Sequence, residues 1–291
     1  MTKYFTFQDS VSHKFWQIEI IGNKQIISFG RVGSLGTIKE KLFESIELCI
    51  SDSIKLIKEK QKKGYLESQT SLKVGDISDP NLKIGQYLKA QYNSYKAKFL
   101  GLKNVHSAFS DLYESLEKFD IGAYKAKVAH EIEVHLKDWW INPEKGINPN
   151  EVVYSILFEY NYFRQKDVQA DAYGIVAWEN FKLHTKSFYI DDYDFAEGFY
   201  AMPGITLNFF DELEKLSWQH NPDSTLSEEI GFEEIQKVYV FYGFVILNEV
   251  FYELGQKGIF KTINAKKGFM FMIGEHDMGD IFPIYTLAAN T

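Results

Sequence analysis

The stretch that decides the fold of the first part of the chain is Ser28-Phe29-Gly30-Arg31-Val32-Gly33-Ser34. It completes a strand-like run over residues 24–29 and leads into a turn, where glycine lets the backbone adopt positive φ or approach another chain closely. Arg31 adds a planar cation whose five donors suit phosphate oxygens. The same residue types also fit a β-hairpin with Phe29 in the core and Arg31 solvated or ion-paired. The neighbouring segments are therefore needed to decide whether Phe29 and Arg31 have a binding role or a structural one.

Those segments predict a small antiparallel sheet followed by one helix. Residues 14–20 read Lys-Phe-Trp-Gln-Ile-Glu-Ile, an aromatic strand with apolar residues at alternate positions. A turn at Gly22-Asn23 leads into the strand of the opening stretch, and a charged strand at 38–43 and a helix from Glu44 to about Lys63 follow. Lysines at the end of that helix either form a solvated turn that complements the helix dipole or bind phosphate: Lys55, Lys58, Lys60, Lys62 and Lys63.

This order of elements, ending in Lys62-Lys63-Gly64-Tyr65, resembles the WGR domain over roughly residues 1–68. The WGR domain occurs in poly(ADP-ribose) polymerases and in many bacterial proteins. In members that bind DNA breaks, the tryptophan packs on a sugar at a strand end and the arginine contacts the backbone. The resemblance assigns those roles to Phe29 and Arg31. The name-giving tryptophan is replaced by Phe29, which keeps a flat apolar face but has less area and no N–H donor, so we expect weaker stacking.

The candidate binding site is the Phe-Gly-Arg motif with the lysines of the surrounding strands. We expect it to contact nucleic acid or a partner protein through Phe29, Gly30, Arg31, Lys14, Lys24, Lys39 and Lys41. The charge balance supports a local site: residues 1–70 hold 11 Lys and Arg against 8 Asp and Glu, a balance of +3. The rest of the chain has 21 basic against 32 acidic residues, a balance of −11, which is a poor surface for nucleic acid and suits a basic protein partner.

The composition describes a globular, cytoplasmic protein of two domains. The chain has 291 residues, of which 45% are hydrophobic and 25% charged, with 24 Phe and 18 Tyr. We find no run of about 18 apolar residues and no secretory signal, so we expect no membrane association. Cys49 is the single cysteine, so we expect a buried thiol and no disulfide within the chain.

The polar segment 69–82 has the composition of a linker, which predicts a WGR-like domain at 1–68 and a second domain at 83–291. Hydrophobic periodicity predicts an α+β second domain, an antiparallel sheet covered by helices. Its order of elements faintly resembles a bacterial domain family of unknown function, and this resemblance implies no catalytic residues. The predicted helices are 84–100, 105–118, 122–140, 208–218 and 227–257, and the predicted strands are 152–160, 168–178, 268–273 and 281–287.

Three groups of residues in the second domain could support chemistry. His130 and His135 lie five residues apart, roughly 140° around a helix, whereas a zincin needs a spacing of four, so we interpret them as helix-surface residues. Glu275, His276 and Asp277 lie in a predicted loop where a histidine could act as a base. An acidic segment could gather a divalent cation but lacks the spacing of an EF-hand, so we expect an acidic loop before a helix: Asp191, Asp192, Asp194 and Glu197.

The sequence favours a binding protein over an enzyme. We find no nucleotide-binding glycine motif and no convincing ADP-ribosyltransferase signature, and we expect no catalytic residue, no cofactor and no metal. The leading hypothesis is a WGR-like module that recognises nucleic-acid ends or a partner protein, with an acidic effector domain. One alternative is an immunity or regulatory protein that binds a basic toxin or enzyme without nucleic acid. A second is a hydrolase that uses Glu275, His276 and Asp277.

Overall fold

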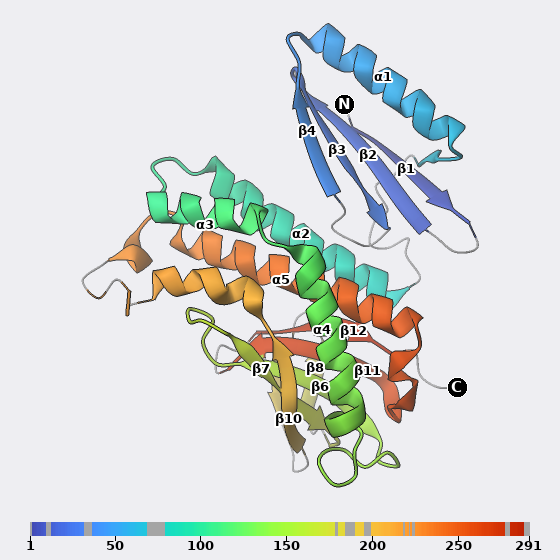
Figure 1. The fold of residues 1–291 in the computed structure, drawn as a ribbon, viewed down its shortest axis with the longest axis vertical. Coiled ribbons are helices and arrows are strands. Elements are labelled where there is room, and N and C mark those ends of the chain that lie inside the picture. The colour runs from blue at the N-terminus through green and yellow to red at the C-terminus, as the bar shows by residue number, and fades with distance from the viewer. Residues whose placement is uncertain are drawn as a thin grey trace. The chain divides into compact units, whose positions relative to one another are not determined.

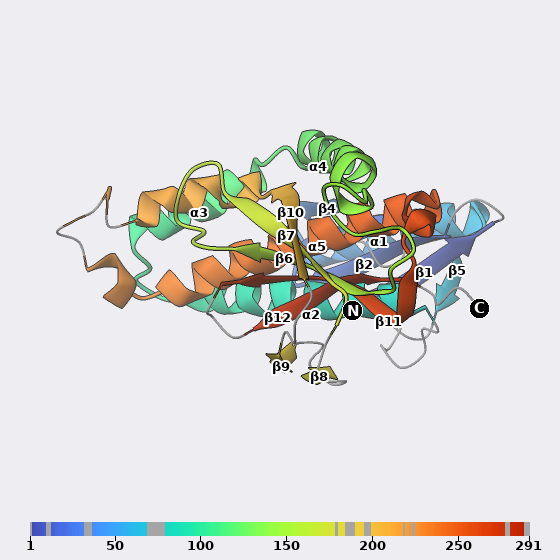
Figure 2. The same cartoon turned by 90° about the horizontal axis from the view of Figure 1, so that it is seen from below.

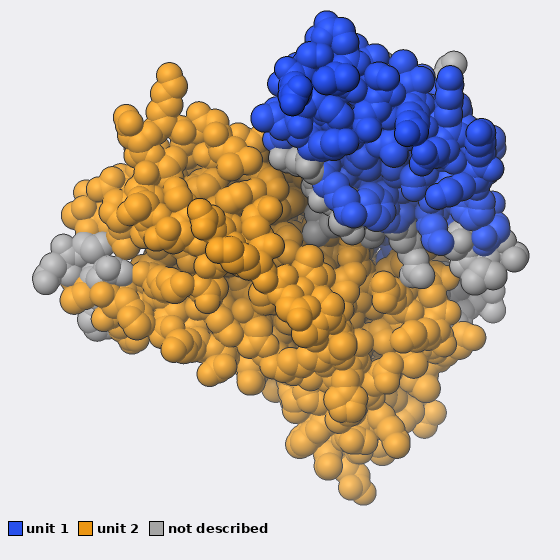
Figure 3. Space-filling view, turned by 45° about the horizontal axis from the view of Figure 1, so that its top comes forward, with its two compact units in different colours: residues 1–86 blue, residues 87–291 orange. Residues whose placement is uncertain are grey.

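The computed structural model divides the chain into two compact units, residues 1–86 and residues 87–291 (Figure 3). The division falls inside helix α2 (Pro80–Gly101). The domain bounds expected from the sequence stay a prediction, because residues 69–78 of the expected linker lie outside the described residues. The structure describes residues 2–9, 13–31, 37–68, 79–177, 180–183, 190–194, 199–217, 219–220, 222, 225–276 and 280–287.

The first unit is an antiparallel sheet with one helix on one face (Figure 1). The strands lie in the order β4-β3-β2-β1-β5, and helix α1 (Ile46–Lys62) packs against β2 and β3. Every neighbouring pair in this sheet is antiparallel. The strands are β1 (Thr2–Gln8), β2 (His13–Ile21), β3 (Lys24–Arg31), β4 (Thr37–Leu42) and β5 (Leu66–Ser68).

Helix α1 begins and packs as its sequence predicts. The Ser45 Oγ accepts a hydrogen bond from the Leu48 amide, which caps the helix N-terminus. The side chains of Cys49, Ser53 and Ile57 recur at every fourth position and form its buried stripe. Together with Ile57, the sheet residues Phe5, Trp16 and Ile18 form the core of this unit. The helix is tied to β3 by a buried polar contact, in which Gln25 Nε2 donates to Ser53 Oγ at 2.7 Å.

The second unit contains a seven-stranded sheet in the order β10-β7-β6-β11-β12-β9-β8 (Figure 2). Its neighbouring strands are antiparallel except for β6 and β11, which run parallel. Parallel neighbours need a crossover connection, and here it includes helix α5 (Phe232–Gln256). The strands are β6 (Val153–Tyr160), β7 (Gln169–Ile175), β8 (Asn180–Leu183), β9 (Ile190–Asp194), β10 (Phe199–Thr206), β11 (Ala265–Glu275) and β12 (Ile281–Thr286).

Helix α5 is the central element of the second unit. It is long and apolar enough to cross a membrane by length and composition alone, but 83% of its most apolar window is buried inside the structure. That burial explains its apolar character as that of a core helix. The other helices of this unit are α2, α3 (Ser107–Glu117), α4 (Ile121–His135) with its π-helical extension η2 (Leu136–Trp140), and the 3₁₀ helices η3 (Asn208–Leu216), η4 (Leu226–Glu228) and η5 (Ile259–Thr262).

An aromatic cluster joins the helices of the second unit to its sheet. The fully buried Phe271 on β11 has its ring centroid 4.8 Å from Phe251 on α5 and 4.8 Å from Phe260 on η5. Trp140, also fully buried, packs 5.5 Å from Phe158 on β6 and donates its Nε1–H to a backbone carbonyl of β10. Many aromatic residues of the chain therefore lie in this core.

The structure confirms the α+β class and corrects several local predictions. The segment 191–194, expected to be an acidic loop before a helix, belongs to strand β9, and β8 was not expected at all. The helix expected at 208–218 is a 3₁₀ helix over Asn208–Leu216. Glu275, expected in a loop, is the last residue of strand β11. In segment 191–194, strand pairing overrides the turn preference of aspartate.

Candidate functional site

Phe29 lies on the face of the first sheet that α1 covers. It stands directly opposite Trp16 in the β2–β3 pairing, and its ring packs against the core formed by Phe5, Trp16, Ile18 and Ile57. The ring is half-buried, whereas the Trp16 side chain is only 2% exposed. Phe29 is therefore neither fully solvated nor sealed in the core, and part of its side chain is accessible to a ligand.

Two lysine ammonium groups lie close to the exposed side of this core. Lys39 Nζ, from β4, is 5.8 Å from the Phe29 ring centroid, and Lys60 Nζ, from the last turn of α1, is 5.9 Å from it. Lys60 Nζ also lies 5.6 Å from the Trp16 ring and 5.0 Å from the Tyr65 ring. These distances are within the range of cation–π attraction. We call Trp16, Phe29, Lys39, Lys60 and Tyr65 the Phe29 cluster.

The electrostatics of the cluster differ from those of an ordinary lysine surface. Partial burial, and then the charge of Lys63, lower the pKa of the Lys60 ammonium. Within the described residues neither Lys39 nor Lys60 forms an ion pair with a carboxylate. A cation without a counter-ion on a partly apolar surface is suited to bind an anion.

The β2–β3 pairing places Lys14 and Arg31 next to the cluster. Lys14 pairs with Arg31, two positions along from the pair of Trp16 and Phe29. Because strand residues two apart share a face, both backbone positions belong to the α1 side of the sheet. Lys14 is exposed and Gly30 is half-buried. The Arg31 side chain and residues 32–36 lie outside the described part of the chain.

The two other lysines of the predicted site are not brought to Phe29. Lys24 pairs with Ile21 and Leu42, which are 58% and 73% exposed, so it lies on the face opposite α1. It is also five residues from Phe29 along β3, about 16 Å. Lys41 lies at the far end of β4 and forms an ion pair with Asp52 at 3.4 Å. Of the predicted lysines, Lys14 and Lys39 are positioned near Phe29.

Sequence reasoning missed the role of Lys60 and Tyr65 in the cluster. The sequence offers Lys60 only as one of five helix-end lysines that form a solvated turn or bind phosphate, and Tyr65 only as part of the family resemblance. The signal was the helical spacing, because Lys60 follows the buried Ile57 by three residues and so shares its face. The chain turns back toward the helix at Gly64, whose φ is +85°. The amide of Tyr65 then donates to the Lys60 carbonyl at 3.2 Å.

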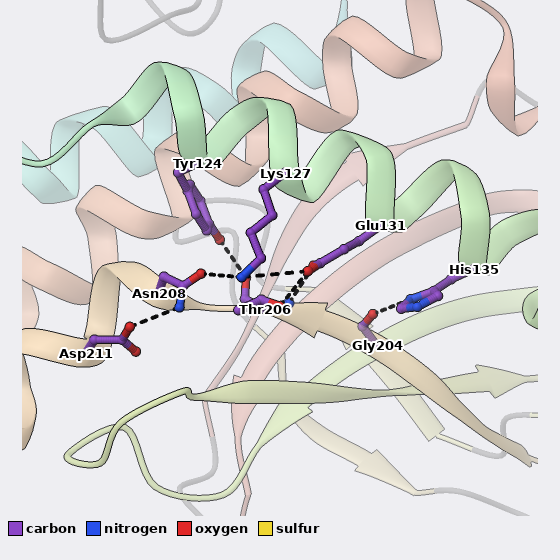
Figure 4. A network of polar contacts seen from close by, with 8 residues as sticks. All are labelled: Tyr124, Lys127, Glu131, His135, Gly204, Thr206, Asn208 and Asp211. Carbon is purple, nitrogen blue, oxygen red and sulfur yellow. Dashed lines mark hydrogen bonds and ion pairs between the residues drawn. The ribbon is translucent and has the colours of Figure 1, made fainter.

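In the second unit, His135 of the His130–His135 motif belongs to a structural network (Figure 4). The Glu131 carboxylate accepts hydrogen bonds from the Thr206 amide at 2.9 Å and from its hydroxyl at 2.6 Å. His135 Nδ1–H donates to the Gly204 carbonyl at 2.7 Å, and Lys127 Nζ donates to Asn208 Oδ1 at 2.8 Å. These bonds fasten α4 to β10 and η3, and His130 is exposed away from them.

The residues of the possible hydrolase site have different partners. Glu275 pairs with Tyr160 in the parallel β6–β11 register, and burial raises the pKa of its carboxyl to about 7, against the opposing effects of Arg164 and Lys237. His276 Nδ1 lies 3.1 Å from Glu159 Oε2. Asp277 lies outside the described residues, as do Glu197 and the side chains of 191–194. Within the described residues, no three His, Cys, Asp or Glu side chains are placed to hold a metal ion.

The first unit therefore has the features of a small binding module, in which one helix covers an antiparallel sheet and a Phe-Gly-Arg strand end carries aromatic and cationic side chains. The family model for the WGR domain matches residues 1–71, which confirms the resemblance found in the sequence. The chain carries a WGR domain at its first unit.

The curated relatives share only part of their length with this chain. The uncharacterized protein YfeS of Escherichia coli K12 is 32% identical over 99 residues, which cover 34% of this chain and 41% of YfeS. Protein YehF of the same organism is 42% identical over 88 residues, which cover 26% of this chain and 32% of YehF. A solved structure from Bacteroides fragilis is 41% identical over 23% of this chain and 19% of its own, with a TM-score of 0.23.

Proposed function

We propose that the WGR domain of this chain binds nucleic acid at the Phe29 cluster, with Arg31 and Lys14 as neighbouring phosphate contacts. The observation that carries the proposal is the half-buried Phe29 ring with the Lys39 and Lys60 ammonium groups 5.8 and 5.9 Å from its centroid. A flat apolar surface beside cations that have no carboxylate partner in the described part of the chain suits a sugar or base with its adjoining phosphate. The WGR match supports binding of nucleic acid or protein in general terms.

The charge distribution confines the expected contact to the first unit. Residues 1–70 have a balance of +3, and the remainder has a balance of −11. Affinity for nucleic acid comes mainly from phosphate neutralisation, so a short row of cations such as Lys14, Arg31 and Lys39 predicts moderate affinity with steep salt dependence. Three phosphate contacts correspond to a slope of about −2.7 in a plot of log K against log salt for duplex DNA.

A titration of the full chain with labelled nucleic acids tests this function. We would measure fluorescence anisotropy at low salt with blunt duplex, nicked duplex and single-stranded DNA, using wild type, Arg31→Ala and Phe29→Ala. The matched control is Lys24→Ala, a lysine of the same strand on the opposite face. We expect Arg31→Ala and Phe29→Ala to weaken binding and Lys24→Ala to leave it unchanged. Absence of binding by wild type at low salt would refute the proposal.

The second unit supports a second candidate function, which is binding of a basic protein. Its support is the acidic balance of −11 over residues 71–291 and three exposed glutamates near the junction of η4 and α5, Glu228, Glu229 and Glu233. A partner held by these charges would dissociate as salt is raised. Capture from a lysate of the source organism by the full chain, followed by elution in a salt gradient, tests it. A captured partner that is not basic, or that elutes independently of salt, would contradict this function.

A further inference from the structure

We propose that Lys60 is a phosphate-binding residue of the Phe29 cluster, and that Trp16 and Tyr65 hold its ammonium group in place for that contact. This inference rests on the proposed nucleic-acid function and adds to it a residue from α1, outside the Phe-Gly-Arg strand. The sequence suggests phosphate binding for five helix-end lysines together, and the position of the Lys60 ammonium group beside Phe29 distinguishes this residue from the others.

The backbone at the end of α1 fixes the position of Lys60. Its carbonyl accepts hydrogen bonds from the Lys63 amide at 3.0 Å and from the Tyr65 amide at 3.2 Å. The chain reverses through Gly64, whose φ of +85° few other residues adopt without strain. The reversal brings the Tyr65 ring to 5.0 Å from Lys60 Nζ. The Lys60 side chain, in the last turn of α1, therefore lies against Tyr65, three residues beyond the end of the helix.

Three aromatic rings hold the Lys60 ammonium without neutralising it. The ring of Trp16 is 5.6 Å away and that of Phe29 is 5.9 Å away, in addition to Tyr65. The faces of these rings attract the cation but carry no net charge. Because the three rings restrict the side chain, a ligand would lose less conformational entropy in ordering it than in ordering a freely solvated lysine.

Other lysines of the first unit show what a structural lysine looks like here. Lys3 pairs with Glu67 at 2.6 Å and Lys41 pairs with Asp52 at 3.4 Å, so each has a carboxylate within ion-pair distance. Within the described residues Lys60 has no such carboxylate, although it is half-buried. A phosphate next to Phe29 would supply the missing counter-charge. The neighbouring Phe29 ring would then contact the sugar or base that belongs to that phosphate.

The test is the salt dependence of DNA binding by Lys60 variants of the full chain. Lys60→Gln and Lys60→Met both keep a long side chain against the rings and remove the charge. If Lys60 contacts one phosphate, each variant reduces the slope of log K against log salt by about 0.9, on every DNA tested. Lys60→Arg keeps the charge and is expected to keep the slope. The matched control is Lys55→Gln, an exposed lysine of the same helix.

The outcomes separate this inference from the proposed function. If Arg31→Ala weakens binding but both charge-free Lys60 variants keep the wild-type slope, Lys60 is only a structural residue and the inference is wrong. If wild type does not bind DNA at low salt, the proposed function and this inference both fail. A loss of affinity in Lys60→Gln that Lys60→Arg does not restore, with no change of slope, would also contradict phosphate binding.

Discussion

Two regions of the molecule differ in what surrounds their lysines: the helices of the second unit and the Phe29 cluster of the first. Among those helices, Lys125 pairs with Glu249 on α5, and Lys96 pairs with Glu117 at 3.1 Å. In the α4 network, Lys127 lies between Glu131 and Asn208. Around Phe29 the described structure pairs Lys39 and Lys60 with aromatic rings instead. The comparison teaches that availability of charge, rather than number of charges, distinguishes a candidate anion site from a stabilising network.

The first prediction concerns the aromatic core of the second unit. Phe271 is fully buried among aromatic rings of β11, α5 and η5. We expect Phe271→Ala to lower the free energy of unfolding of the second unit by about 3–5 kcal/mol, through lost burial and the cavity left behind. Urea denaturation followed by tryptophan fluorescence measures this. The control is Phe199→Ala, since Phe199 is 55% exposed. Equal losses in the two variants would contradict the core assignment.

The second prediction concerns the network that we interpret as structural. Glu131→Ala removes the acceptor of the Thr206 amide and hydroxyl, and it leaves the amide of this buried residue without that partner. We expect a loss of about 1–3 kcal/mol in the free energy of unfolding and no change in DNA affinity. Glu133→Ala is the matched control, because Glu133 is exposed on the same helix. A change in DNA affinity with Glu131→Ala alone would mean that the network belongs to a functional site.

The third prediction tests the helix that supplies Lys60. Ser45→Ala removes the side-chain acceptor for the Leu48 amide at the start of α1. We expect the first unit to lose about 1 kcal/mol of stability, while the salt slope of DNA binding stays unchanged because the Phe29 cluster lies at the other end of the helix. Thermal unfolding and anisotropy titrations measure the two quantities. A lower slope in this variant would show that the cluster responds to helix stability rather than to charge.

The smallest expected effect is a pH dependence of stability in the second unit. Burial raises the pKa of Glu275 from 4.5 to about 7, so the folded state holds a proton that the unfolded state has released at intermediate pH. The contribution of Glu275 to stability is therefore fully present below about pH 4.5 and is lost as the pH rises to about 7. We expect Glu275→Gln to reduce the fall in unfolding free energy between pH 5 and pH 8. Denaturation at both values measures it, and identical falls in wild type and variant would contradict the assignment.

Much of the fold could be predicted from local patterns, because alternation and helical spacing depend on nearby residues. Trp16, Ile18 and Ile20 alternate as a strand does, and the continuous apolar run within α5 predicts a buried helix. The parallel pairing of β6 with β11 could not be predicted, since it joins Ile156 to Phe271 across more than a hundred residues. Local patterns do not determine which of several distant strands will pair.

The candidate site was predicted in part, and the missing parts have physical reasons. The five-residue interval between Lys24 and Phe29 already implies opposite faces of a strand. The sequence alone could therefore have excluded Lys24 from the binding site at Phe29. Lys41 could not, because its neutralisation by Asp52 depends on how α1 lies over β4. Lys60 required the same helix placement, since only packing brings its ammonium group to Phe29.

The most direct test of the account is the salt dependence of DNA binding in two charge-matched double variants of the full chain. Lys14→Gln/Lys39→Gln removes two cations near Phe29, and Lys24→Gln/Lys41→Gln removes two cations placed elsewhere in the same sheet. We predict that the first double variant reduces the slope of log K against log salt by about 1.8 and that the second leaves it near the wild-type value. Equal reductions in both variants, or no binding by wild type at low salt, would contradict a nucleic-acid site at Phe29.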